Sequence, residues 1–330
     1  MPTALVTGSA GFVGYHLSRR LLADGYDVVG FDGLTDYYDV SLKQARQSIL
    51  QKSPAFKAVN ARLEEEGALD TALREAQADV VVHLAAQAGV RYSIDHPRSY
   101  VDSNLIGTFN LLEAVRANPC AHLMLASSSS VFGANTQMPY VETAKADMQM
   151  SFYAATKKAG EAMAHSYAHL YNIPTTVFRF FTVYGPWGRP DMALFKFTRA
   201  MLEGRPIDIY NNGQMARDFT YIDDLVEAIR LLQDKPPEPQ TEGASPVAPY
   251  RLVNIGNAAP VPLMEFVAAL ENALGIEAQK TFHPMQAGDV RETWADTGLL
   301  HDLTGYRPRT SVEDGVAAFI AWYKDHYAIA

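Results

Sequence analysis

The chain has 330 residues, 48% of them hydrophobic and 20% charged, and a formal net charge of -9. This length predicts one large globular unit or two joined ones, and the acidic balance disfavours nucleic acid or an anionic membrane as a partner. A single cysteine gives no disulfide, nine scattered histidines predict no metal site, and no apolar run is long enough to span a membrane, so we expect a cytoplasmic protein.

The first half alternates strand-like runs with segments of helical spacing. Strands are predicted at TALVTG, YDVVGFD, FKAVNA, ADVVVHLAA and AHLMLAS, and the longest intervening helix at PRSYVDSNLIGTFNLLEAVRAN. Strands separated by helices build right-handed βαβ units around a parallel sheet. The expected fold class is α/β, a Rossmann-type doubly wound parallel sheet followed by a smaller mixed α/β region.

The second half is more mixed. It continues with the helix FYAATKKAGEAMAHSYAHLYN, the strands PTTVFRFF and RLVNIG, and the helices PLMEFVAALENALG and VEDGVAAFIAWYKDHY. Residues 234–249 are rich in Pro, Glu and Ser and predict an exposed loop. We expect a dinucleotide-binding domain over residues 1–180, with a returning segment near 220–256, and a substrate domain over 181–330.

The first strand ends in a glycine-rich turn, GSAGFVG, that contains Gly8, Gly11 and Gly14. Glycines at this spacing allow a tight turn and a close approach of the backbone to a pyrophosphate, which would lie at the amino end of the next helix. Asp32 follows the second strand, where an acidic side chain accepts hydrogen bonds from ribose hydroxyls and repels a 2′-phosphate. The pattern predicts NAD in preference to NADP.

A tyrosine and a lysine, Tyr153 and Lys157, are spaced i and i+4 in YAATK and therefore share one face of a helix. A phenol with a pKa near 10 is a poor base at neutral pH, and an ammonium group close by favours the phenolate. The run LMLASSSSVFG, just before this helix, places four hydroxyls at the carboxyl end of a strand. The tyrosine–lysine pair, the serine run and the glycine-rich turn together predict a dehydrogenase-like site.

These motifs resemble the extended short-chain dehydrogenase/reductase family over nearly the whole chain. The resemblance implies that Ser128, three residues before Val131, bonds the reacting sugar oxygen, that Tyr153 is the general acid/base and that Lys157 is its electrostatic partner. The implied cofactor contacts are Gly8, Gly11, Phe12, Val13, Gly14, Asp32, Lys43, Asn60, Ala61, Leu84, Ala85, Ala86, Gln87, Asn104, Ser127, Tyr153, Lys157 and Phe181.

The second half resembles enzymes that act on nucleotide sugars. Arg217, before DFTYIDD, is similar to a residue that grips a diphosphate, and Arg291 takes the place of a second phosphate-binding arginine, because Gln286 stands where relatives have one. The implied substrate contacts are Gln87, Arg91, Ser128, Ser129, Ser130, Tyr153, Thr182, Arg189, Arg217 and Arg291.

The residues after Ser128 separate the possible reactions. Dehydratases of this family have an Asp-Glu pair there and decarboxylases a Glu, whereas this chain has Ser129 and Ser130. Two stretches, DYYDVSLKQAR and FFTVYGPWGRPDMA, are similar to the UDP-glucuronate 4-epimerases, and Thr182 stands where UDP-glucose epimerases have Asn. The resemblance implies C4 epimerisation of UDP-glucuronate to UDP-galacturonate with tightly bound NAD.

Three alternatives remain open: a UDP-glucuronate decarboxylase, a UDP-glucose 4-epimerase, and a non-catalytic NAD-sensing protein. Fold alone does not decide among them. The family resemblance also implies a homodimer in which helices around 104–118 and 152–171 form a four-helix bundle.

Overall fold

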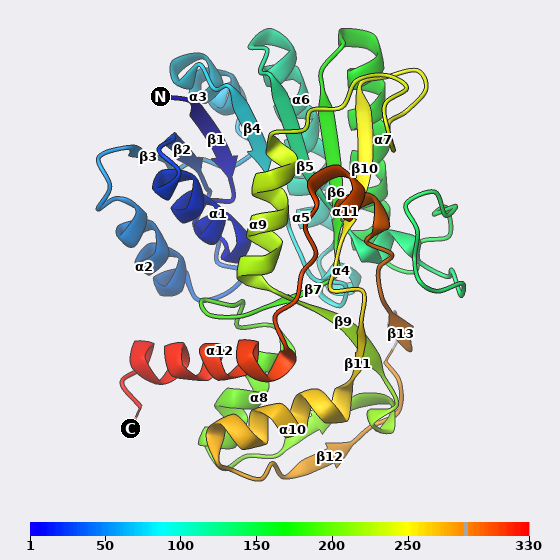
Figure 1. Ribbon diagram of the computed structural model, residues 1–330. Helices are drawn as coiled ribbons and strands as arrows, with labels where there is room; N and C mark the ends of the chain where they lie inside the picture. Colours follow the sequence, from blue (N-terminus) through cyan, green and yellow to red (C-terminus); the bar gives the residue numbers. More distant parts are fainter. Residues whose placement is uncertain (287–289, 330) are drawn as a thin grey trace.

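The computed structural model describes residues 1–286 and 290–329, and its largest element is a seven-stranded parallel sheet with the order β10-β6-β5-β4-β1-β2-β3 (Figure 1). Its strands are β1 Thr3–Thr7, β2 Asp27–Phe31, β3 Phe56–Val59, β4 Val80–His83, β5 His122–Ser128, β6 Thr175–Phe180 and β10 Tyr250–Ile255. Central strands such as β4 are buried along their whole length, as expected when helices cover both faces. The predicted α/β fold is confirmed.

Helices cover both faces of this sheet (Figure 1). One face carries α1 Phe12–Ala23, α9 Ile222–Gln233 and α11 Gly298–Thr304, with α2 Val40–Leu50 beside α1, and the other carries α3 Ala68–Ala76, α6 Gly107–Ala117 and α7 Phe152–Tyr171. Successive residues of a strand point to opposite faces, so Val6 belongs to the core under α1 and Leu5 to the core under α6. The site described below lies at the carboxyl ends of these strands.

The remaining elements form a smaller layer below the carboxyl ends of the large sheet (Figure 1). Its strands are β7 Thr182–Tyr184, β8 Ile207–Ile209, β9 Ala216–Tyr221, β11 Pro260–Pro262, β12 Lys280–Phe282 and β13 Glu292–Thr293, and its helices are α8 Ala193–Leu202, α10 Leu263–Leu274 and α12 Val312–His326. β7, β11 and β13 pair with β9, and β12 pairs with β8. Phe195, Phe219, Phe266 and Phe319 pack at its centre.

The long helix predicted after β4 is divided in the structure. Over residues 97–118 it consists of α5 Pro97–Tyr100 and a π-helical segment, Val101–Ile106, that continues directly into α6, and a short helix, α4 Tyr92–Asp95, precedes it. Pro97 starts a new helix at its first position, which is where proline is tolerated. The π-helical segment turns Asn104 toward the wall of the site described below.

The loop over 234–249 is attached to the sheet by one buried side chain. Arg251 of β10 donates to the carbonyl oxygens of Lys235 and Glu242 at 2.9 and 3.0 Å and to the Thr241 hydroxyl at 3.2 Å. The exposed loop that composition predicts is therefore held at several points. Within the described residues, no helix combines the length and the apolar character needed to cross a membrane.

Candidate active site

A cavity of about 420 Å³ opens at the carboxyl ends of the parallel strands, between the large sheet and the smaller layer. Ligands of open α/β sheets bind at this edge. Many of the residues predicted from the sequence line it: Gly8, Gly11, Phe12, Val13, Gly14, Asp32, Lys43, Ala61, Leu84, Ala85, Ala86, Gln87, Ser127, Ser128, Tyr153, Lys157, Phe181 and Arg189. The strand ends therefore bring together motifs that are up to 180 residues apart in the sequence.

The glycine-rich turn has no room for larger side chains. Gly8 has a φ of +73°, and a Cβ atom on Gly14 would lie 2.0 Å from the Gly8 carbonyl oxygen, so helix α1 packs directly on the turn. The helix begins at Phe12 after Gly11, whose position has no side-chain cap. Amide groups of an uncapped first turn are free to bind an anion such as a pyrophosphate.

The acidic side chain at the end of β2 lies beside this turn. Asp32 accepts hydrogen bonds from the backbone N–H of Ala10 at 2.9 Å and of Leu34 at 2.8 Å, and it lines the cavity. Lys43 of α2 donates to the carbonyl oxygen of Thr35 at 2.6 Å, and burial lowers its pKa. A glycine-rich turn that lets the backbone approach a pyrophosphate, next to a carboxylate that can bond ribose hydroxyls, matches the requirements of a dinucleotide.

Tyr153, at the start of α7, faces the end of β5. Burial raises the pKa of Tyr153, whereas a hydrogen bond with Ser128 and the charge of Arg189 lower it. The sequence predicted that Lys157 would lower this pKa, but Lys157 Nζ donates to the carbonyl oxygen of Ala126 at 2.9 Å. Burial lowers the pKa of Lys157 to about 8, so Lys157 is mainly protonated at neutral pH. The structure gives the larger influence on Tyr153 to Ser128 and Arg189.

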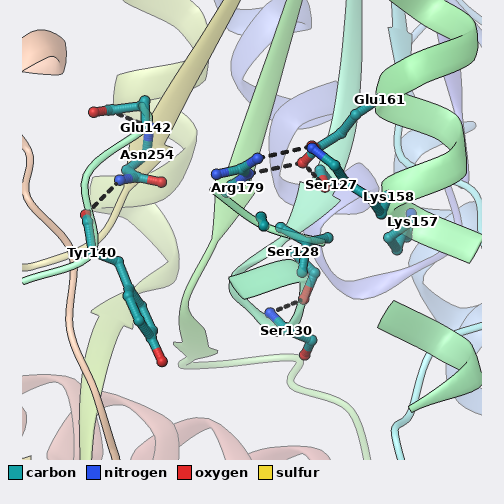
Figure 2. A network of polar contacts seen from close by, with 12 residues as sticks. Ser127, Ser128, Ser130, Tyr140, Glu142, Lys157, Lys158, Glu161, Arg179 and Asn254 are labelled. Carbon is teal, nitrogen blue, oxygen red and sulfur yellow. Dashed lines mark hydrogen bonds and ion pairs between the residues drawn. The ribbon is translucent and has the colours of Figure 1, made fainter. Parts of the chain in front are cut away.

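The four serines at the end of β5 and just after it have different environments, and Figure 2 shows Ser127, Ser128 and Ser130. The Ser127 hydroxyl donates a hydrogen bond to Glu161 at 2.6 Å, while Ser128 Oγ accepts from the backbone N–H of Ser130 at 3.2 Å. The hydroxyls of Ser129 and Ser130 have no hydrogen-bond partner among the described residues, and both line a second cavity. These two are therefore available to a ligand.

The second cavity, of about 150 Å³, is lined by Ser129, Ser130, Thr182 and Arg217 together with Tyr140 and Thr293. Thr182 begins β7, next to β9, which carries Arg217. The Arg217 guanidinium donates to the carbonyl oxygens of Val290 at 2.6 Å and Arg291 at 3.1 Å. These residues, far apart in the sequence, place hydroxyls and a guanidinium around one space.

Arg189 reaches the main cavity from the loop after β7. Its Nε and Nη2 atoms donate to the two carboxylate oxygens of Asp191, at 3.0 and 2.5 Å, and Tyr37 donates to the same carboxylate at 3.1 Å. Asp191 occupies one edge of the guanidinium, which leaves the Nη1 group for a second acceptor. Tyr37 and Asp191 complete this arrangement, and single-sequence reasoning did not select either of them.

Four predicted contacts lie outside the lining of both cavities. Asn60 and Arg291 are exposed, and the Arg91 guanidinium lies over the Tyr210 ring. Asn104 is buried and bonds the backbone N–H and carbonyl of Gln87, at 2.8 and 3.0 Å, so it shapes the cavity wall from behind. The lining also includes Arg62, Leu63, Tyr92 and Met192, which belong to none of the motifs recognised in the sequence.

A buried arginine, Arg46 of α2, connects the glycine-rich turn to the loop that precedes Arg189. Nη1 donates to the Ala10 carbonyl oxygen at 3.0 Å, and Nη2 donates to those of Trp187 and Gly188 at 2.6 and 3.2 Å. The side chain is fully buried, and these bonds satisfy its two Nη groups, whereas Nε has no partner among the described residues. Among the described residues, no group of three or more His, Cys, Asp or Glu side chains is placed to hold a metal ion.

Comparisons with known proteins agree with this geometry. The model of the NAD dependent epimerase/dehydratase family matches residues 4–256. A probable UDP-glucuronate 4-epimerase of Rhizobium meliloti (strain 1021) is 56% identical, with 98% of this chain and 97% of the relative covered. UDP-glucuronate 4-epimerase 4 of Arabidopsis thaliana is 45% identical, with 99% and 76% covered.

The fold is also similar to solved structures. The crystal structure of a UDP-glucuronic acid 4-epimerase from Bacillus cereus, in complex with UDP-glucuronic acid and NAD, has a TM-score of 0.89 and 33% identity, and covers 98% of this chain and 100% of its own. The family match and the full-length relatives give one conclusion: this chain belongs to the NAD-dependent epimerase/dehydratase family.

Proposed function

We propose that this protein interconverts UDP-glucuronate and UDP-galacturonate by epimerisation at C4. The observation that carries the proposal is the set of donors at the end of β5: the guanidinium of Arg189 lines the main cavity together with Tyr153 and Ser128, and the hydroxyls of Ser129 and Ser130, which follow Ser128 directly, line the second cavity. These groups are donors, which is what a sugar carboxylate requires. The names of the full-length relatives point to the same reaction.

The residues present fit NAD, because the turn at Gly8 and Gly14 excludes side chains and Asp32 is fixed beside it. When bound there, NAD would supply the hydride acceptor and donor for C4 of the sugar. Tyr153 takes the proton of the C4 hydroxyl and later returns it, with Ser128 bonding the same oxygen. Lys157, held by the Ala126 carbonyl, presents its ammonium group to the cavity.

The 4-keto sugar formed in this way is a β-keto acid, which loses CO₂ when its carboxylate bond stands perpendicular to the ketone plane. An epimerase must therefore hold the carboxylate near that plane while the sugar turns about its link to the diphosphate. We assign this role to Ser129, Ser130, Thr182 and Arg189. Arg217, and Arg291 behind it, are assigned to the diphosphate end, although Arg291 is exposed in this structure.

The alternatives are disfavoured by particular residues. A decarboxylase has a Glu after the Ser128 position, whereas Ser129 and Ser130 cannot act as acid or base near neutral pH. A UDP-glucose epimerase has no carboxylate to hold and no need of Arg189. A non-catalytic sensor of NAD has no need of Ser128 and Tyr153.

We expect the purified protein, with no NAD added, to convert UDP-glucuronate into UDP-galacturonate to an equilibrium mixture. The physical reason is that hydride leaves and returns within one turnover, so NAD is regenerated. Chromatography of the sugar nucleotides and absorbance at the NADH wavelength measure this, with UDP-glucose as the control substrate. UDP-xylose as main product, turnover of UDP-glucose alone, or no turnover of either substrate would each replace the proposal with a named alternative, and stoichiometric NADH would contradict it.

We further propose a homodimer formed by α6 and α7. Large apolar side chains are exposed on and beside these helices: Ile106, Phe109, Phe152, Leu170 and Tyr171. Phe109 is 49% exposed, which is costly for a side chain of this size unless a partner covers it.

The single Cys120, free and half-buried, is consistent with a cytoplasmic location, which we also propose.

We expect light scattering to give twice the chain mass of 36.3 kDa for the wild type and a lower mass for Phe109→Glu. A charge at this position would have to be desolvated in the interface. Leu170→Gln, at the other end of the α6–α7 surface, serves as a second variant. A wild type that is monomeric at micromolar concentration would contradict the dimer.

A further inference from the structure

Three side chains of α7 form one stripe along the end of β5. Tyr153, Lys157 and Glu161 are spaced by four residues, so they lie on successive turns of the same helix face. Lys157 Nζ donates to the Ala126 carbonyl oxygen at 2.9 Å, and Glu161 Oε1 accepts from the Ser127 hydroxyl at 2.6 Å. Consecutive residues of β5 are thus attached to consecutive turns of α7.

The carboxylate of Glu161 is saturated with donors (Figure 2). Arg179 of β6 donates through Nε to Oε1 and through Nη2 to Oε2, both at 2.8 Å, and Lys158 Nζ donates to Oε2 at 2.9 Å. Glu161 is 2% exposed and Arg179 1%, so water does not screen the pair. Burial raises the pKa of Glu161, but Arg179 and the other donors outweigh it and keep the pKa low.

The charge of Glu161 acts directly on Lys157. Burial lowers the pKa of Lys157 to about 8, and the Glu161 carboxylate opposes this effect. His83, which faces Lys157 from β4, is fully buried and its pKa is lowered to about 3, so it contributes no charge. Tyr153 is a neutral phenol, and Arg189 acts on that phenol. Glu161 is therefore the group that favours the ammonium form of Lys157.

We propose that Glu161 is a positioning residue for the reaction, which fixes the end of β5 against α7 and holds Lys157 as a protonated, oriented donor. Arg179 is its counter-ion: a lone buried carboxylate would be neutralised by a proton, and the arginine prevents this. This inference rests on the proposed function for its kinetic test. It adds two residues, from α7 and β6, to the machinery around Tyr153.

The test compares Glu161→Gln with Arg179→Met in the pH dependence of kcat/KM for UDP-glucuronate. Glu161→Gln keeps the shape and removes the charge, so Lys157 loses its proton more easily and the alkaline limb should move to lower pH by about one unit, a typical spread for pKa values in proteins. Arg179→Met removes the counter-ion, so Glu161 takes up a proton more easily and the limb should also move to lower pH, by less than in Glu161→Gln. Unshifted limbs in both variants would overturn the proposal.

A purely structural ion pair gives a different result. Both variants would then lose thermal stability and rate, without any shift of the limb. Ser127→Ala, which removes one hydroxyl and no charge, is the matched control and should keep the wild-type limb. If Glu161→Gln does not fold, the double variant Glu161→Gln/Arg179→Met leaves no buried charge unpaired and should fold with the same downward shift.

A second measurement is independent of turnover. The affinity of the cofactor-stripped protein for NAD is measured by calorimetry across the same pH range. It should fall as the pH rises, and in Glu161→Gln this fall should begin at a lower pH than in the wild type. An identical pH dependence in the two proteins would also overturn the proposal. If the wild type binds NAD but does not epimerise UDP-glucuronate, the proposed function fails while this measurement still decides the role of Glu161.

Discussion

Replacing Tyr153 with Phe should lower turnover of UDP-glucuronate by at least ~100-fold, the lower range for loss of a general acid/base. The variant removes one hydroxyl from a side chain whose ring stays packed against Tyr100, so the fold and bound NAD should be retained. Initial rates at saturating substrate measure the loss, and the NAD content after purification shows whether the cofactor site is intact.

The loss should appear in kcat and leave KM little changed, because the Tyr153 proton transfer is made in the transition state. Tyr100→Phe is the matched control: its hydroxyl donates to the carbonyl oxygens of Ala88 at 2.9 Å and Gly89 at 2.5 Å, so the variant removes one phenol hydroxyl that is bonded to the backbone. A near-normal rate in Tyr153→Phe would transfer the role of base to Ser128 acting with water.

Removing one donor of the carboxylate site should convert part of the epimerase activity into decarboxylation. For Thr182→Ala and Arg189→Ala we expect the fraction of turnovers that release CO₂ to rise by about tenfold or more, since each bond to a charged group contributes roughly 1.5–3 kcal/mol. The physical reason is that a less constrained carboxylate reaches the perpendicular orientation more often. Trapping of CO₂ and chromatography of the UDP-4-keto-pentose measure the leak.

Asp191→Asn tests the orientation of the Arg189 guanidinium separately from its presence. It leaves the guanidinium in place and removes the carboxylate that orients it, so the leak should be smaller than in Arg189→Ala. Slower epimerisation without any gain in decarboxylation, in both Thr182→Ala and Arg189→Ala, would show that Thr182 and Arg189 do not hold the carboxylate.

The sequence predicted the fold well where periodicity is strong. The glycine-rich turn, Asp32 and the Tyr153–Lys157 pair are local patterns, and their positions at strand ends follow from the parallel sheet. The predicted strands and long helices of the large sheet are present, including β10 after a loop of 16 residues, 234–249. The short strands β8, β11 and β12 carry too few residues for a pattern to be visible.

The site was less predictable where it depends on contacts between distant segments. Nothing near Arg189 indicates that Tyr37, about 150 residues earlier, would share its partner Asp191. The engagement of Ser127 by Glu161 depends on the facing of α7 and β5, which a single sequence does not specify. Residues 287–289, between Gln286 and Arg291, lie outside the described residues, so the phosphate role of Arg291 stays a prediction.

Arg46 holds together the side of the site that contains the glycine-rich turn, and it lies apart from the second cavity. Its guanidinium holds the turn at Ala10 and the loop at Trp187 and Gly188 together, so opening that side would strip a buried cation of several acceptors at once. Ser129, Thr182 and Arg217 line the other cavity, and exchange of a sugar nucleotide there leaves those bonds unbroken. The side of the site that Arg46 spans is therefore held by several hydrogen bonds, and the second cavity involves none of them. An enzyme that regenerates its own NAD in each turnover needs a firmly held cofactor, because loss of NADH in mid-cycle would leave the 4-keto sugar unreduced.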